Sequence, residues 1–204
     1  MIFDPQYRKE KRTARISMAL IRLSLALKKM MQAEREPLDL SPLQIHALLF
    51  AAFTRNDVAT VGNFSITIGA THVTAVKVIQ GLVKKGLIVK IPNPDDRRVT
   101  LLELTSNGKE LVSKLENWGH SLEESLNSMS DQLLVNFELG LGSLLSSLEK
   151  RGHLVVAEPC LGCIHFHPNV GDPTAPHYCE LIRKHISHEA SLQECPEHTP
   201  SLAD

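Results

Sequence analysis

All four cysteines of this 204-residue chain lie in one short segment near its C-terminus. Their spacing is Cys160-x2-Cys163-x15-Cys179-x15-Cys195. Four thiolates are the number that closes a tetrahedral zinc site or holds an iron–sulfur cluster. In a reducing compartment, clustered cysteines are more typical of metal binding or redox sensing than of disulfides. We therefore expect these cysteines to be ligands in a metal-binding or iron–sulfur-binding tail.

Three kinds of chemistry fit this segment. Structural zinc often uses a close pair of cysteines with nearby histidines, and His165, His177 or His198 could replace a thiolate. An iron–sulfur cluster commonly takes one close pair and more separated single cysteines, and the spacing here resembles that of high-potential iron–sulfur proteins. Bare thiols would instead oxidise, first between Cys160 and Cys163. The spacing favours an iron–sulfur cluster, with zinc as the alternative.

The tail differs in composition from the rest of the chain. From Arg151 onward, three Lys or Arg residues face seven acidic residues, whereas the stretch from Arg55 to Thr100 carries seven Lys or Arg and three Asp. The tail also has too few aliphatic residues to bury a core of its own, which favours an additional stabilising cross-link such as a bound metal centre. The change of composition near Gly152 predicts a main domain of residues 1–152 and a Cys/His-rich tail of residues 153–204.

Side chains suited to DNA contact follow one another in the basic middle of the chain. The order helix, turn, helix, charged hairpin is typical of a winged helix, in which the start of the second helix enters the major groove. Lys77 would neutralise a phosphate, whereas hydroxyl and imidazole groups could reach base edges. Arg97 and Arg98 at the hairpin tip suit the minor groove. The candidate DNA-binding residues are Thr71, His72, Thr74, Lys77, Arg97 and Arg98.

Apolar periodicity and cap signals predict a mainly α protein with a small β-hairpin wing at about residues 87–104. A first helix, basic in its first turns and apolar from Ile16 to Met31, should end before Pro37. The further elements expected are helices over Pro42–Phe53, Val58–Thr67, Thr71–Lys85, Thr105–Leu126, Asp131–Lys150 and Tyr178–His188, and strands over Leu87–Ile91 and Val99–Leu104. In the helix that Thr71 begins, we expect Val73, Val76, Ile79, Leu82 and Val83 to face inward. The long helices should form a dimerisation bundle.

The run Leu82-Val-Lys-Lys-Gly-Leu-Ile, followed by Asp95-Asp-Arg-Arg-Val-Thr-Leu-Leu-Glu-Leu-Thr-Ser-Asn-Gly108, resembles the wing region of the MarR family of bacterial transcriptional regulators. The match covers about residues 10–150. The resemblance implies a homodimer with a winged helix-turn-helix in each subunit and recognition of a pseudo-palindromic operator. It also implies that Asp96 orients Arg98 toward DNA. Phe64-Ser65 departs from the family, which usually has a Leu-Ala pair there.

The sequence therefore predicts a regulator that binds double-stranded DNA, with activity modulated by the centre in the tail through the packing of the tail on the bundle. The sequence contains no phosphate loop, no Gly-x-Ser-x-Gly elbow and no metal-hydrolase helix motif, so we do not expect an enzyme. The N-terminus lacks the apolar core of a signal peptide and no apolar run approaches ~18 residues, so we expect a cytoplasmic protein without a membrane segment. One alternative is a metal-binding or electron-transfer module whose helical part only dimerises. Another is a regulator that responds to a small-molecule effector, such as the phenolic acids that many members of the family bind. In that case the tail would be a purely structural zinc site.

Overall fold

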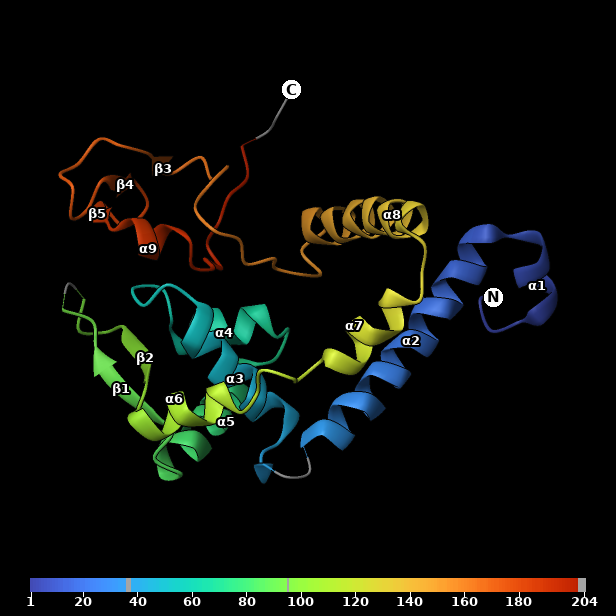
Figure 1. Ribbon diagram of the computed structural model, residues 1–204, viewed down its shortest axis with the longest axis horizontal. Helices are drawn as coiled ribbons and strands as arrows, with labels where there is room; N and C mark the ends of the chain where they lie inside the picture. The colour runs from blue at the N-terminus through green and yellow to red at the C-terminus, as the bar shows by residue number, and fades with distance from the viewer. Residues whose placement is uncertain (36–37, 95, 202–204) are drawn as a thin grey trace. The chain divides into compact units, whose positions relative to one another are not determined.

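The computed structural model describes residues 1–35, 38–94 and 96–201. Figure 1 shows a mainly helical chain with a small β-hairpin and a second small sheet near the C-terminus, so the expected fold class, mainly α with a small hairpin wing, is confirmed. Contacts divide the chain into two units, one of residues 1–42 and 116–136 and the other of residues 43–115 and 137–204. Pro37 and Asp95, which took part in the sequence predictions, lie outside the described residues.

The first unit, formed by residues 1–42 and 116–136, is mainly helical. Its helices are α1 (Pro5–Glu10), α2 (Arg12–Arg35) and α7 (His120–Asn127), and α7 packs against α2. The single N-terminal helix predicted from the sequence is wrong, because Lys11 adopts an extended backbone that separates α1 from α2. Across this break the Arg15 guanidinium donates to the carbonyl oxygens of Arg8 and Lys9.

The predicted helix from Thr105 to about Leu126 is also wrong. The chain forms α6 (Ser106–Ser113), then turns, and begins α7 after Gly119, whose φ of 92° lies in the left-handed region. Glycine adopts this conformation without the steric penalty of a side chain. The last predicted long helix is confirmed as α8 (Asp131–Lys150).

The second unit contains a winged helix-turn-helix, which we call the reading lobe and define as residues 43–115. Its elements are α3 (Pro42–Phe53), α4 (Val61–Thr67), α5 (His72–Lys84), β1 (Ile88–Pro92), β2 (Thr100–Leu104) and α6. Ile45, Leu48 and Ile79 are fully buried in its core. Phe64 is fully buried too, with its ring centroid 5.4 Å from that of Phe50. The departure from the family at Phe64 therefore supplies an aromatic core contact.

The helix α5 begins and ends as its sequence predicts. Thr71 accepts a hydrogen bond from the Thr74 amide, and Gly86 follows the helix with a φ of 68°. The buried face of α5 is narrower than predicted and consists of Ala75, Ile79 and Leu82. The prediction is wrong for Val73 and Val83, whose exposed fractions are 63% and 39%. Both valines lie at the edges of the stripe that Ala75, Ile79 and Leu82 define at helical spacing. The helix before α5 begins later than predicted, with Thr60 as its cap.

The hairpin of β1 and β2 is joined to the rest of the reading lobe at both ends. Its strands are antiparallel, with Ile88 opposite Leu104. The Leu102 amide donates to the Ala59 carbonyl oxygen over 2.8 Å, which links the wing to the segment before α4. At the other end, the Thr105 hydroxyl donates to the Gly86 carbonyl oxygen. These bonds hold the wing against both helices of the helix-turn-helix.

The tail (residues 153–204) folds as a small sheet followed by a short helix. Its strands β3 (Phe166–His167), β4 (His177–Cys179) and β5 (Lys184–Ile186) are antiparallel in that order, and Ser187 caps α9 (His188–Ser191). The helix predicted from Tyr178 to His188 is wrong, because Arg183 has a φ of 54° in the turn between two strands. Cys160, Cys179 and Ile186 form a small buried cluster in the tail.

No single helix in the described ranges is long and apolar enough to cross a membrane, although the bent pair of α4 and α5 meets those two requirements jointly.

Candidate nucleic-acid interface and cysteine site

The helix-turn-helix leaves an open groove of about 350 Å³ beside the start of α5 and the wing. The axes of α4 and α5 differ by 116°, which lies in the range of ~90–120° that is usual for this motif. His72 from α5, Lys90 from β1 and Arg98 from the hairpin tip line the groove together. The structure thus brings together two of the predicted DNA-binding residues and adds Lys90, which the sequence analysis did not single out.

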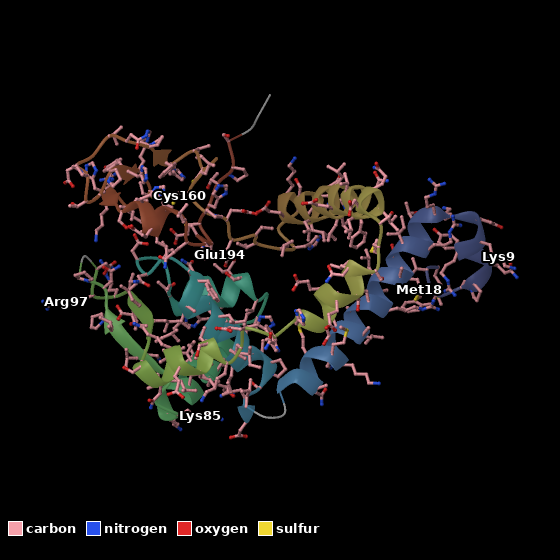
Figure 2. All side chains as sticks on the ribbon, in the orientation of Figure 1. Lys9, Met18, Lys85, Arg97, Cys160 and Glu194 are labelled. Carbon is pink, nitrogen blue, oxygen red and sulfur yellow. The ribbon has the colours of Figure 1, made fainter. Side chains whose placement is uncertain are left out.

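The other predicted DNA-binding residues lie near this groove but differ in how free their side chains are. Lys77 is exposed on α5, and Figure 2 shows Arg97 at the end of the hairpin. The hydroxyl oxygens of Thr71 and Thr74 are 2.9 Å apart, and that of Thr71 also accepts from the Thr74 amide. These two threonines therefore serve first as the cap of α5.

The wing acid contacts the arginine that it was expected to orient. Asp96 Oδ1 accepts a hydrogen bond from the Arg98 backbone amide over 2.9 Å and lies 3.5 Å from Arg98 Nε. The Arg98 side chain is otherwise 94% exposed. An exposed ion pair of this kind contributes little to stability. Its effect is to limit the directions in which the guanidinium can point.

The four cysteines, far apart in sequence, line one cavity in the second unit. All four are free thiols; Cys160, Cys179 and Cys195 are buried and Cys163 is half-buried. The cavity measures about 10 Å³, which is room for about one water molecule. Burial raises the pKa of the Cys160 thiol, and it raises the pKa of Cys195 to about 11. Without a bound cation, burial therefore favours the neutral form of these two thiols.

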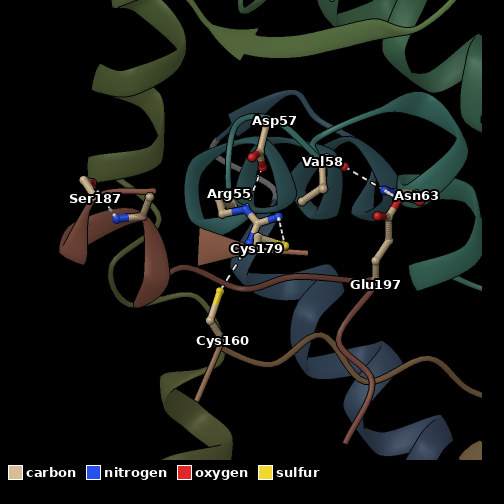
Figure 3. Close-up of polar contacts among 9 residues, drawn as sticks. Arg55, Asp57, Val58, Asn63, Cys160, Cys179, Ser187 and Glu197 are labelled. Atoms are coloured by element: carbon tan, nitrogen blue, oxygen red, sulfur yellow. Dashed lines mark hydrogen bonds and ion pairs between the residues drawn. The ribbon is translucent and has the colours of Figure 1, made fainter. Parts of the chain in front are cut away.

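The cavity wall also contains an arginine from the reading lobe. The Arg55 side chain is 3% exposed; its Nη1 donates to Cys160 Sγ over 3.2 Å and its Nη2 lies 4.0 Å from Cys179 Sγ. Its Nε donates to Asp57 Oδ1 over 2.6 Å, as Figure 3 shows. Burial lowers the pKa of Arg55, but the hydrogen bond and charge of Asp57 and the nearby Cys195 and Cys160 raise it overall. Arg55 is therefore a buried cation.

Sequence reasoning missed this role of Arg55. The residue was counted with the basic stretch attributed to DNA, whereas its side chain faces the cysteines of the tail. The only local signal is Asp57 two residues later, since an acid at that spacing could neutralise a buried arginine. The cysteine partner is 105 residues away in the chain, so no local pattern indicates it.

Two of the three histidines considered as replacement ligands line the cavity. His165 and His198 do so, whereas His177 Nε2 lies 3.1 Å from His188 Nδ1. Within the described ranges, the buried Nε2 of His198 has no hydrogen-bond partner. A buried polar atom without a partner is the usual sign of a missing ligand or water. However, no three His, Cys, Asp or Glu side chains of the described residues are arranged to hold a single metal ion.

The tail is joined to the reading lobe next to this cavity. The Arg55 amide donates to the Glu194 carbonyl oxygen over 2.9 Å, and the Glu194 amide donates to the Phe53 carbonyl oxygen over 3.0 Å. Asn63 of α4 donates through Nδ2 to Glu197 Oε1 over 3.0 Å. Figure 2 labels Glu194 where the tail meets the lobe. These contacts are with the reading lobe, whereas the sequence led us to expect packing on the helical bundle.

Solved structures share this arrangement of helices and wing. A MarR family protein from Bacillus stearothermophilus matches 69% of this chain and 97% of its own, with 21% identity and a TM-score of 0.57. The S. aureus MepR–DNA complex matches 65% of this chain and 97% of its own, with 24% identity and a TM-score of 0.59. E. coli MarR in its apo form matches 63% of this chain and 96% of its own, with 19% identity and a TM-score of 0.53. This chain has the MarR fold.

Sequence comparison adds one relative and no family model, since none matches the chain. The relative is the uncharacterized HTH-type transcriptional regulator YhbI of Bacillus subtilis, with 26% identity over 87 residues. That match spans 43% of this chain and 55% of YhbI, so the chain covers about half the length of this relative. The named relatives are regulators or proteins of the MarR fold, in agreement with the expectation that this chain is not an enzyme.

The MarR fold accounts for only part of this chain. The three solved structures are matched over nearly their whole lengths but over no more than 69% of this chain. Close to a third of the chain therefore has no counterpart in them. The cysteine site joins this MarR-like lobe to the tail through Arg55.

Proposed function

We propose that this protein is a transcriptional regulator that binds double-stranded DNA as a homodimer on a pseudo-palindromic operator. The observation that carries the proposal is the groove in which His72, Lys90 and Arg98 meet beside α5 and the wing. Basic side chains at these places neutralise phosphates and fix the register of a reading helix. Two comparisons support it: MepR, which shares the fold, is solved as a complex with DNA, and YhbI is a transcriptional regulator of the HTH type.

The homodimer is supported by the apolar surface of α8. Along this helix six large apolar side chains are exposed by a third or more, which is costly for a surface that stays in water. They are Leu133, Val135, Phe137, Leu139, Leu141 and Leu145. Helical spacing places Leu133, Phe137, Leu141 and Leu145 on one face of α8, and Val135 and Leu139 on another. A second copy of the chain would cover the first of these faces with its own copy of that face, as a two-fold interface requires.

The second part of the proposal is that the four cysteines bind an iron–sulfur cluster. The thiols surround one cavity, but they do not close on a single point as a zinc site does, with Zn–S distances of about 2.3 Å. His198, whose buried Nε2 has no hydrogen-bond partner among the described residues, and Arg55, whose guanidinium donates to Cys160 Sγ, line the same cavity. When bound, such a cluster supplies an electron-accepting or oxidant-sensitive centre.

Zinc is the second candidate for the cysteines, and the small volume of the cavity favours it. A cavity of about 10 Å³ has the volume for a single ion, around which the thiols would have to close, whereas a cluster requires the surrounding loops to move apart. In that case the tail is a structural clip, and its ligation contributes directly to folding. The signal would then be a small-molecule effector, for which an open pocket of about 290 Å³ beside α3, β2 and α6 offers space.

The DNA-binding proposal is tested by neutralising the proposed contacts. Lys77→Gln and Arg98→Gln should each weaken binding to a duplex selected from a random pool with the parent protein. Each should also reduce the slope of log affinity against log salt by about 1, because one phosphate contact is lost. Lys150→Gln, at the end of α8, is the matched control and should behave as the parent does. If both variants bind DNA like the parent, the assignment of these residues as DNA contacts is wrong. A parent chain that selects no duplex from the pool would instead favour a metal-binding or electron-transfer module whose helical part only dimerises.

The cofactor is tested on protein purified without oxygen. Iron, sulfide and zinc per chain are measured beside the visible absorption spectrum. Stoichiometric iron and sulfide with a charge-transfer band, both lost in Cys179→Ser, would support the cluster. One zinc per chain and no colour would assign the tail to zinc. Protein with neither metal, whose thiols react freely with an alkylating reagent, would exclude both centres.

A further inference from the structure

The geometry points to Arg55 as the positioning residue through which occupancy of the cysteine site controls the helix-turn-helix. This inference rests on the proposed function and names the regulatory step of the same site. Arg55 belongs to the reading lobe by sequence, yet its guanidinium donates to Cys160 Sγ of the tail over 3.2 Å. Among the described residues that line the cysteine cavity, Arg55 is the one from the reading lobe, and Figure 3 shows its guanidinium beside Cys160 and Cys179.

The electrostatic argument begins with the counter-charges of Arg55. A buried cation requires a partner, and Asp57 is the carboxylate in contact with it, at 2.6 Å. Asp57 is itself 28% exposed, so water weakens the attraction that it can provide. Cysteines must be deprotonated to ligate a metal. The four thiolates carry more negative charge than the positive charge of the zinc ion or cluster core that they would hold. Loading the site therefore adds net negative charge beside the Arg55 guanidinium, 3.2 Å from Cys160 Sγ, and stripping the site removes it.

The mechanical argument follows the chain from Arg55 toward the DNA-reading elements. The Val58 amide donates to the Arg55 carbonyl oxygen, and Val58 and Ala59 are buried. The carbonyl oxygen of Ala59 accepts the amide of Leu102 in the wing. Thr60, the next residue, caps α4. A shift of Arg55 would therefore reach the wing and α4 through Val58 and Ala59, which are buried and hydrogen-bonded to Arg55 and to Leu102 respectively.

A second contact makes the same connection from the tail. Glu197, which lines the cysteine cavity two residues after Cys195, accepts a hydrogen bond from Asn63 of α4. The Asn63 amide group also donates to the Val58 carbonyl oxygen over 2.9 Å. Movement of the loop that carries Cys195 is thereby transmitted to the helix that supports α5. Arg55 and Asn63 hold the two ends of the segment that lies between them.

The inference predicts that binding of a metal or cluster at the cysteine site changes the affinity for DNA, and that this effect depends on Arg55. The dissociation constant for the selected duplex is measured with the parent chain loaded and stripped of the metal that it binds. The two values should differ by a factor in the usual allosteric range, about 5- to 150-fold. Arg55→Gln should bring this factor close to one while the variant still takes up the full metal content. Arg151→Gln, an exposed arginine after α8, should keep the factor of the parent.

Hydrogen exchange provides a readout that does not depend on DNA. In the parent, loading should change the protection of backbone amides in residues 54–63, and in Arg55→Gln this change should disappear. Asp57→Asn is the second variant, chosen because it keeps the arginine if Arg55→Gln does not fold. Its thermal midpoint should rise more on loading than that of the parent, since the site then becomes the main counter-charge of Arg55.

The outcomes separate this inference from the proposed function. A fully loaded Arg55→Gln with the coupling factor of the parent would overturn the role of Arg55 and leave the regulator proposal intact. An Asp57→Asn midpoint that rises no more than the parent's would overturn it as well. A parent chain that binds no DNA in either state would instead contradict the proposed function itself.

Discussion

At the scale of single residues, the wing shows how an acid can matter for DNA binding although it repels phosphates. Asp96 accepts the Arg98 amide and lies 3.5 Å from its Nε, while the Arg98 side chain remains almost fully in solvent. The carboxylate restricts the arginine before DNA arrives, so less conformational entropy is lost on binding. Arg55 shows the opposite arrangement, since its acid partner accompanies a buried guanidinium.

This difference predicts a distinct effect for Asp96→Ala. Affinity for the selected duplex should fall by about two- to fivefold, because the arginine is no longer oriented and an exposed pair carries little energy. The salt slope should not decrease, since no phosphate contact is removed. Titrations at several salt concentrations measure both quantities. A rise in affinity would show that Asp96 acts on DNA only by repulsion.

At the scale of elements, the start of α6 is packed closely against the corner between α5 and β1. A side chain at Gly108 would collide with the carbonyl oxygen of Leu87. The Gly108 amide donates to the Thr105 hydroxyl oxygen, and the Thr105 amide donates to the same Leu87 carbonyl oxygen. The glycine therefore permits a close approach of backbone to backbone, and the wing depends on it.

Gly108→Ala should destabilise the protein by about 1–3 kcal/mol, as overpacking of a close contact does. Gly142→Ala in α8 is the matched control, because, its chain neighbours and the nearby backbone of its own helix apart, no described residue lies within 4 Å of the position of its added Cβ. The control should gain up to about 1 kcal/mol from helix propensity. Denaturant unfolding followed by circular dichroism gives both values. Equal stabilities of the two variants would contradict the close packing at the start of α6.

At the scale of the whole molecule, the proposed dimer depends on the exposed apolar face of α8. Leu133→Asp, at a position 51% exposed in the single chain, should shift the protein from dimer to monomer in sedimentation velocity. DNA affinity should fall with it, because a monomer reaches only one half-site. Val170→Asp in the tail, 60% exposed, is the matched control and should leave the assembly unchanged. A dimer that survives Leu133→Asp would place the interface elsewhere.

Local patterns were enough to predict the reading lobe. The cap at Thr71, the left-handed glycine at Gly86 and the charged hairpin act within a few residues, and each appears where it was expected. The same local rules missed the breaks at Lys11 and Gly119. No Pro or Gly marks the basic stretch around Lys11, and apolar periodicity continues across Gly119. Periodicity reports which face can be buried, and not whether the backbone remains helical.

The cysteine site shows what lay beyond such patterns. The count and spacing of the cysteines indicated a thiolate site, yet the strands around Cys179 and the docking of the tail on the reading lobe were not foreseen. The role of Arg55 depends on a thiol 105 residues away in the chain. A buried charge is stabilised by whatever the fold brings beside it. The tertiary structure therefore determines that Arg55 contacts Cys160, because the neighbouring sequence supplies only Asp57 as a partner.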